Sequence, residues 1–226
     1  MRRATVWLQR GVALVFGLSC LAVAAYAFAF FYREASLGNP FTARFVVSGW
    51  DVPGHIFGGG LALLLAPLQL LSGVRRRWPR LHRLSGGVYA GAILIAAISG
   101  LSLSLHSQGG AATGSAFAIL AVLWLGCTAM GIRYAIRRDF ANHRRWMFRS
   151  VALTASAVTL RIILGVGSGV LHLPPLPVYI TAAWACWTVN LAVCELILRW
   201  PWIRARVWPR NAGSQPSSRG AQSAPA

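Results

Sequence analysis

Six long apolar stretches, separated by short polar loops, constrain this chain more than any other feature of its sequence. Each stretch reaches the roughly 20 residues that an α-helix needs to cross the hydrocarbon core of a bilayer. We therefore expect an all-α membrane protein, built as a bundle of six transmembrane helices. The expected spans are residues 11–32, 52–73, 86–106, 114–136, 147–172 and 177–199.

The basic residues, all of them arginine, are distributed unevenly between the loops. Nineteen of the 22 arginines lie in or beside the N-terminal segment, the second–third loop, the fourth–fifth loop and the C-terminal segment. The loops between them hold only Arg33 and Arg44. Because arginine accumulates in cytoplasmic loops, we expect both termini in the cytoplasm and the chain in the inner membrane of a bacterium.

The composition excludes a soluble fold and leaves no room for a separate catalytic domain. Hydrophobic residues make up 56% of the chain and charged residues 12%, so a soluble globule would expose far too much apolar surface. The net charge of +18 is explained by the topology and by attraction to anionic lipid headgroups. We expect the lipid bilayer, and no nucleic acid, as the partner, with any active site between helices or at their ends.

The chain is expected to form one membrane domain over residues 1–200 and a disordered cytoplasmic tail over residues 201–226. The last part of that tail consists mainly of small and polar residues, which cannot bury a core. The first apolar run is longer than an ordinary signal-peptide core, so we expect an uncleaved anchor. The four cysteines lie inside apolar spans without a Cys-x-x-Cys-His motif, a pattern typical of buried hydrophobic residues rather than covalent haem attachment.

The histidines fall into two sets by expected depth. His55, His106 and His172 lie near the outer ends of their spans, whereas His82 and His143 lie near the inner ends. A bundle cytochrome needs imidazoles from different helices at one level. Hydrogen-bonded histidines at the membrane interface would give the same pattern, so both interpretations stay open.

Two of these histidines are followed by arginine at the start of a span. His82 precedes Arg83, and His143 precedes Arg144 and Arg145. A helix N-terminus with adjacent arginines can bind an anion. The alternative is that these arginines only set the topology.

Polar residues also occur within the spans. A stripe on the second span carries His55, Gly59, Ala62, Ala66, Gln69 and Gly73, which would let another helix or a flat cofactor approach closely. Arg161 lies 11 residues before His172 and therefore about 16 Å below the outer end of its helix. An arginine at that depth needs a polar partner, a water-filled cavity or an anionic ligand. Asn190 and Glu195 complete the polar intramembrane set, and Glu195 is expected too far in depth from Arg161 to pair with it.

Several short motifs resemble one family of bacterial integral membrane proteins, domain of unknown function 2306, over roughly residues 50–200. Gly87 departs from that pattern, where such sequences often carry a second basic residue, and His106 and His172 match no family motif. The resemblance implies the membrane fold and no particular reaction. The motifs are His55-Ile56; Pro67-Leu68-Gln69 with Arg75 and Arg77; Leu81-His82-Arg83 with Gly86 and Tyr89; His143-Arg144-Arg145-Trp146-Met147 with Arg149; and Leu160-Arg161-Ile162.

Two functional hypotheses follow from these residues. In the first, the protein binds haem b or interacts with a quinone, with His55, His82 and His143 as iron ligands and Arg83 or Arg161 contacting haem propionates or a quinone; a quinone or a redox protein would be its partner. In the second, it is a cofactor-free transport or regulatory protein in which the same residues form a polar pathway or an interaction surface. An ultraviolet-visible spectrum separates the two, because haem b absorbs strongly.

Overall fold

The computed structural model describes residues 2–29 and 49–200, and within these residues every regular element is a helix. Six helical segments are long and apolar enough to cross a membrane, which confirms the expected fold class. The expected tail over residues 201–226 lies outside the described residues. The six segments are Arg10–Ala29, Asp51–Leu70, Pro79–Ser104, Ala111–Ile136, Phe140–Val170 and Pro175–Arg199.

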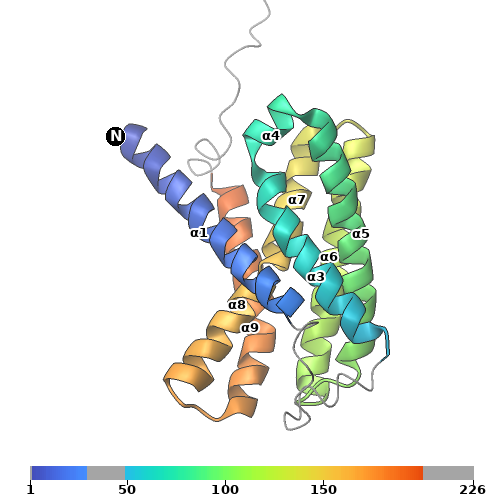
Figure 1. The fold of residues 1–226 in the computed structure, drawn as a ribbon, viewed down its shortest axis with the longest axis vertical. Helices are drawn as coiled ribbons and strands as arrows, with labels where there is room; N and C mark the ends of the chain where they lie inside the picture. Colours follow the sequence, from blue (N-terminus) through green and yellow to red (C-terminus); the bar gives the residue numbers. More distant parts are fainter. Residues whose placement is uncertain (1, 30–48, 201–226) are drawn as a thin grey trace, which may run out of the picture.

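Four helices form an antiparallel bundle at the centre of the molecule (Figure 1). Around the bundle, α3 packs on α5, α5 on α6, α6 on α7, and α7 on α3, which places α5 and α7 at opposite corners. The short helix α4 joins α3 to α5. The bounds are α3 Asp51–Leu70, α4 Ser72–Arg77, α5 Pro79–Ser104, α6 Ala111–Ile136 and α7 Phe140–Thr154.

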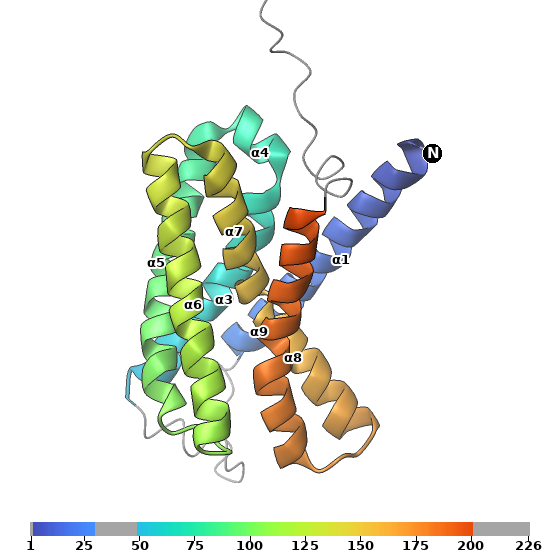
Figure 2. The same cartoon turned by 180° about the vertical axis from the view of Figure 1, so that it is seen from behind.

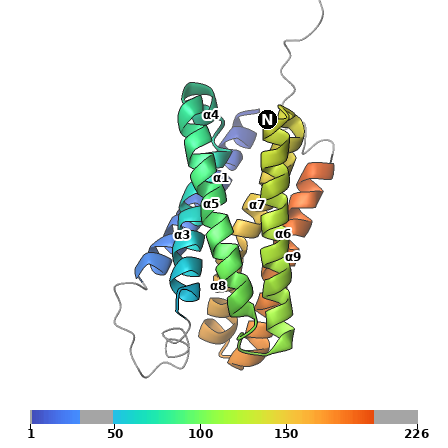
Figure 3. The same ribbon diagram turned by 90° about the vertical axis from the view of Figure 1, so that its right-hand side faces the viewer.

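Three further elements pack outside this bundle. Helix α1 (Arg2–Ala29) crosses α3 obliquely, and α8 (Ser156–Leu164) pairs with α9 (Pro175–Arg199) as a hairpin (Figure 2). A π-helical turn, η1 (Gly165–Val170), ends the first arm of that hairpin. The start of α1, the α6–α7 turn and helix α4 lie at the same end of the molecule (Figure 3).

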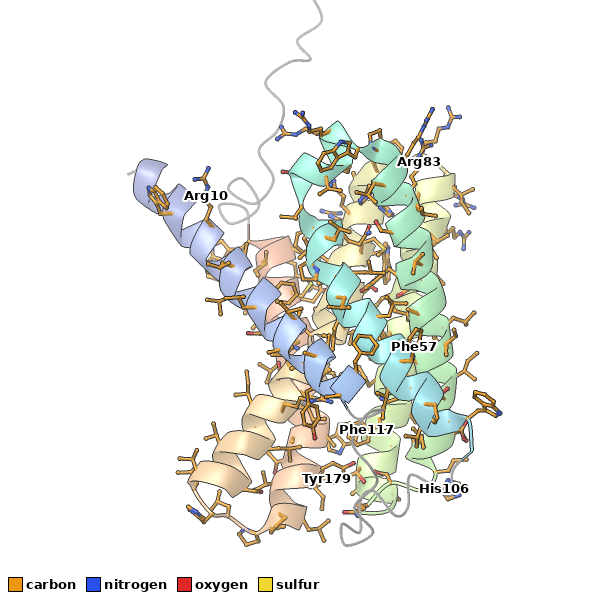
Figure 4. All side chains as sticks on the ribbon, viewed as in Figure 1. Arg10, Phe57, Arg83, His106, Phe117 and Tyr179 are labelled. Carbon is orange, nitrogen blue, oxygen red and sulfur yellow. The ribbon has the colours of Figure 1, made fainter. Side chains whose placement is uncertain are left out.

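We call this the arginine-rich end, because Arg10, Arg83 and the arginines of α4, α7 and the last turn of α9 lie there, whereas His106 lies at the opposite end (Figure 4). The segregation of arginine that the sequence indicates is therefore present in the fold. Which end faces the cytoplasm is an expectation that follows from the arginine rule.

Two local signals start α5 and α7 at the arginine-rich end. Pro79 is the first residue of α5, a position where the missing N–H has no helical partner to lose. Asp139 caps α7 by accepting a hydrogen bond from the Asn142 backbone N–H at 3.1 Å. That bond and the side-chain amide of Asn142 hold the pKa of the Asp139 carboxyl below its usual range. Arg138 follows the end of α6 and has its own backbone in the left-handed region, with a φ of 60°.

The fifth span differs from the single helix expected over residues 147–172. It begins at Phe140, is 31 residues long, and breaks at Ala155, where α7 ends and α8 diverges from the bundle. Thr154 donates a hydrogen bond to the carbonyl of Ser150 at 3.0 Å, and Thr159 donates one to the carbonyl of Ala155 at 3.4 Å. Side chains that bond back to the preceding turn bend helices, which accounts for the change of direction here.

The α3–α5 contact is a close approach inside the bundle that depends on a missing side chain. A Cβ atom at Gly58 would lie 2.6 Å from the carbonyl oxygen of Ala92, whereas one at Gly59 would meet nothing within 4 Å. Ala62 and Ala66 of the predicted stripe are fully buried. The stripe contains Gly59, however, whereas the glycine that contacts α5 is Gly58, one position earlier.

Candidate functional site

His82 and His143 both lie at the arginine-rich end of the bundle. Each is the fourth residue of its helix, and α5 and α7 run in the same direction from that end. Equal rise therefore places both residues about 4.5 Å inside the first residue of their helices. The two imidazoles are close enough to interact electrostatically, although they come from opposite corners of the bundle. We call them the imidazole pair.

The hydrogen bonding of the imidazole pair is incomplete. The Nδ1 atom of His143 is 2.8 Å from the carbonyl oxygen of Gly131 on α6, which fixes the ring and leaves Nε2 available. The Nδ1 atom of His82 is buried and has no hydrogen-bond partner among the described residues. A buried polar atom without a partner normally has a specific reason.

The surroundings of the imidazole pair are strongly basic. Arg75 on α4 acts electrostatically on both His82 and Arg144, and Arg83 follows His82 with an exposed side chain. Of the described acidic residues, Asp51 accepts a hydrogen bond from Ser102, and Glu195 pairs with two arginines. Asp139 lies one turn before His143 and bonds Asn142. Arginines therefore outnumber carboxylates near the pair.

A second polar group, which we call the hydroxyl network, fills the middle of the bundle. The Tyr89 hydroxyl on α5 is hydrogen bonded to Ser150 at 3.1 Å and to Thr154 at 2.7 Å, both on α7. Trp124 donates to Thr154 at 3.0 Å, and Thr128 is bonded to Ser150 at 2.8 Å. All five side chains are buried. The sequence contains the signal for this network, since its α6 and α7 members recur at helical spacing, but it does not show that Tyr89 joins them.

Arg161 and His55 lie together, away from the imidazole pair. Arg161 donates a hydrogen bond to the carbonyl of Ala157 at 3.0 Å, its guanidinium is 5.3 Å from the ring centre of Tyr26 on α1, and it acts electrostatically on His55. The Nδ1 atom of His55 is 2.8 Å from the carbonyl oxygen of Ala96. Arg161 comes 18 residues after His143, which is about 27 Å of helix, so these residues and the imidazole pair cannot hold one cofactor.

The other predicted polar residues have structural partners. Gln69 donates to the hydroxyl of Ser85 at 2.8 Å. Asn190 joins α9 to the fifth span by donating to the carbonyl of Ala152 at 3.1 Å and accepting from Thr159 at 3.0 Å. Glu195 pairs with Arg149 and Arg199 rather than with Arg161, in keeping with the depth argument.

The described residues contain no group of three or more His, Cys, Asp or Glu side chains that could hold a bare metal ion. A haem needs only two axial ligands, because the porphyrin supplies the other four. The imidazole pair supplies two such side chains. His106 is exposed at the opposite end (Figure 4), and His172 is exposed in the turn between η1 and α9, so neither belongs to the imidazole pair.

The sequence matches one protein family. The family model described as "Predicted membrane protein (DUF2306)" matches residues 52–198. The chain belongs to this family. The match runs from the start of α3 to the end of α9, so the DUF2306 segment contains the whole bundle, the imidazole pair and the hydroxyl network, and leaves out α1. Neither a curated protein nor a solved structure matches the chain.

Proposed function

We propose that this membrane protein binds haem b at the arginine-rich end of its bundle, with His82 and His143 as the axial ligands. The observation that carries the proposal is that two imidazoles interact electrostatically from opposite corners of a four-helix bundle, each at the fourth position of a helix that begins at the same end. Helix bundles hold cofactors with side chains that project inward from facing helices. Imidazole is a usual axial ligand of haem iron.

The hydrogen bond of His143 supports a ligand role. Histidines that bind a metal usually donate their second ring N–H to a carbonyl or carboxylate, which orients the ring. The bond between His143 and Gly131 has this form. His82 has a ring nitrogen that the described chain leaves without a partner, and a bound group between the two rings would complete the site.

The charge around the imidazole pair supports the same cofactor. Ferric haem b carries two propionates and a net charge of about −1, and its carboxylates bind best to arginine. Arg75 and Arg144 lie beside the pair, and Arg83 is within the first turns of α5. We assign the propionate contacts to these residues, and not to Arg161, because Arg161 lies too far along the fifth span.

Held by His82 and His143, a haem would supply one-electron transfer. The protein would then carry electrons at one face of the membrane, with a quinone or a redox protein as donor or acceptor. The alternative, a cofactor-free transport protein, finds less support, because the hydroxyl network fills the middle of the bundle with groups that bond one another.

The test is the absorption spectrum of protein purified from cells supplied with haem. We expect a Soret band, an α band that appears on reduction, and about one haem per chain. His82→Ala and His143→Ala should each abolish the bands, whereas the matched control His106→Ala should retain them. His143→Met should retain haem with a shifted spectrum and a higher reduction potential, because thioether ligation raises the potential.

Two results would overturn the proposal. One is a folded wild-type protein, monodisperse in detergent, that takes up no haem in the cell or on reconstitution. The other is full haem content in both alanine variants, which would place any haem elsewhere in the chain.

A further inference from the structure

A cavity of about 240 Å³ lies between α7 and the last turn of α9 at the arginine-rich end. Its α7 residues, Asn142, Arg145, Trp146 and Arg149, recur at steps of three and four and so share one face of the helix. His143 is on a different face and bonds to α6. The cavity is therefore separate from the imidazole pair.

The lining of this cavity carries three guanidinium groups and one carboxylate, a net charge of +2. Glu195 accepts from Arg149 Nε at 2.5 Å through one oxygen and from Arg199 Nε at 3.1 Å through the other. Both carboxylate oxygens are thus engaged, and the contacts use the Nε atoms of the two arginines. Each of these two guanidinium groups also carries terminal N–H donors, and Arg145 adds a third cation.

The other acid near this cavity, Asp139, lowers the net charge to +1 and does not neutralise it. Asp139 acts electrostatically on Arg145, but its oxygens bond the backbone and side-chain nitrogens of Asn142. One carboxylate already committed to a helix cap leaves Arg145 able to bind a further anion. The geometry therefore supplies several N–H donors around a small space with excess positive charge, which is the chemistry that recognises a phosphate group.

The position of the cavity distinguishes a lipid phosphate from a free ion. The cavity lies at the arginine-rich ends of the fifth and sixth spans, where we expect these helices to reach the membrane surface. It is lined by Trp146, whose ring is 4.8 Å from the Arg149 guanidinium, and by buried Leu198. A phospholipid presents phosphate and apolar chain together at this level, and basic pockets between transmembrane helices bind anionic headgroups. We propose that this cavity binds the phosphate of an anionic phospholipid.

Native mass spectrometry of the purified, detergent-solubilised protein can test this site. Cardiolipin, phosphatidylglycerol, phosphatidylcholine and inorganic phosphate would be titrated separately. We expect the two anionic lipids to bind with defined stoichiometry, and phosphatidylcholine and inorganic phosphate to bind much more weakly. Arg145→Gln and Arg199→Gln should each weaken cardiolipin binding about five-fold, the effect of one arginine near an anionic headgroup.

The matched control is Arg133→Gln, which removes an exposed arginine from the last turn of α6 at the same end. Equal losses in Arg133→Gln and Arg145→Gln would show diffuse surface attraction and overturn the proposal. Unchanged binding in both Arg145→Gln and Arg199→Gln would do the same. Tight binding of inorganic phosphate that responds to these variants would identify a free-anion site instead. Arg199→Gln keeps the Arg149–Glu195 pair, so it reports on the site even if Arg145→Gln fails to fold.

Discussion

The middle of the bundle and its arginine-rich end are built from the same helices. They differ in how completely their buried polar groups are hydrogen bonded. In the middle, the Tyr89 hydroxyl is fully buried and has two partners on α7. At the end, His82 on the same helix has a buried ring nitrogen without a described partner and cationic neighbours. In the middle, the polar side chains find their hydrogen-bond partners within the chain. At the end, the partner of the His82 nitrogen would have to come from a bound group.

This contrast makes a testable division. Substitutions in the middle should change stability and leave haem content unchanged, while substitutions of the imidazole pair should do the reverse. A substitution that changes both by comparable amounts would show that the two regions are not independent.

A large effect on stability is expected at the α3–α5 contact. Gly58→Ala places a Cβ 2.6 Å from a backbone oxygen of Ala92, so the helices must move apart. We expect a loss of about 1–3 kcal/mol, the usual cost of overpacking. Gly59→Ala is the matched control, since its Cβ meets open space and alanine favours the helix. Thermal unfolding in detergent measures both, and similar melting temperatures for the two variants would contradict the packing described here.

A smaller loss is expected from Tyr89→Phe. The substitution keeps the ring and removes the hydroxyl, while Ser150 retains Thr128 and Thr154 retains Trp124 as partners. The expected cost is about 0.5–1.5 kcal/mol, the net value of a buried hydrogen bond. Chemical denaturation in mixed micelles would measure it. Haem content should stay at the wild-type value. A haem-free Tyr89→Phe protein would contradict the expectation that the middle of the bundle affects stability and not haem binding.

The smallest effect is a pH dependence at the α7 cap. The pKa of Asp139 is lowered in the folded protein, so its stabilising contribution is present above the unfolded value near 4 and is lost as the pH falls through the folded value. The melting temperature of Asp139→Ala should therefore lie below wild type at neutral pH by a constant amount. The difference should shrink as the pH falls below about 4. A difference that does not change with pH would indicate that the charge of the cap contributes nothing.

The number and position of the spans could be predicted because the thickness of a bilayer fixes the length of an apolar helix. The faces of the helices could not be predicted as well. Gly59 was placed in a packing stripe, but Gly58 makes the contact, and one residue changes the direction of a side chain by about 100°. Nor could an apolar stretch reveal the break at Ala155, which depends on hydroxyls that bond back to the preceding turn.

The sequence predicts only part of the arrangement of the histidines. Depth along each span separates His82 and His143 from His55, and the structure keeps these residues apart. Which histidines at one level meet depends on the order of helices around the bundle, and that order follows from tertiary packing. Because burying a charge is costly, the sequence predicts a polar neighbour for Arg161. It does not identify the Tyr26 ring on α1, which is distant in sequence.

The break at Ala155 also has a consequence for the order of synthesis. All residues of the imidazole pair, the hydroxyl network and the Gly58 contact precede it, while the α8–α9 hairpin follows. The four helices of the bundle are therefore synthesised before α9. The nascent chain can assemble its central unit, and offer His82 and His143 to a ligand, while α9 is still being made.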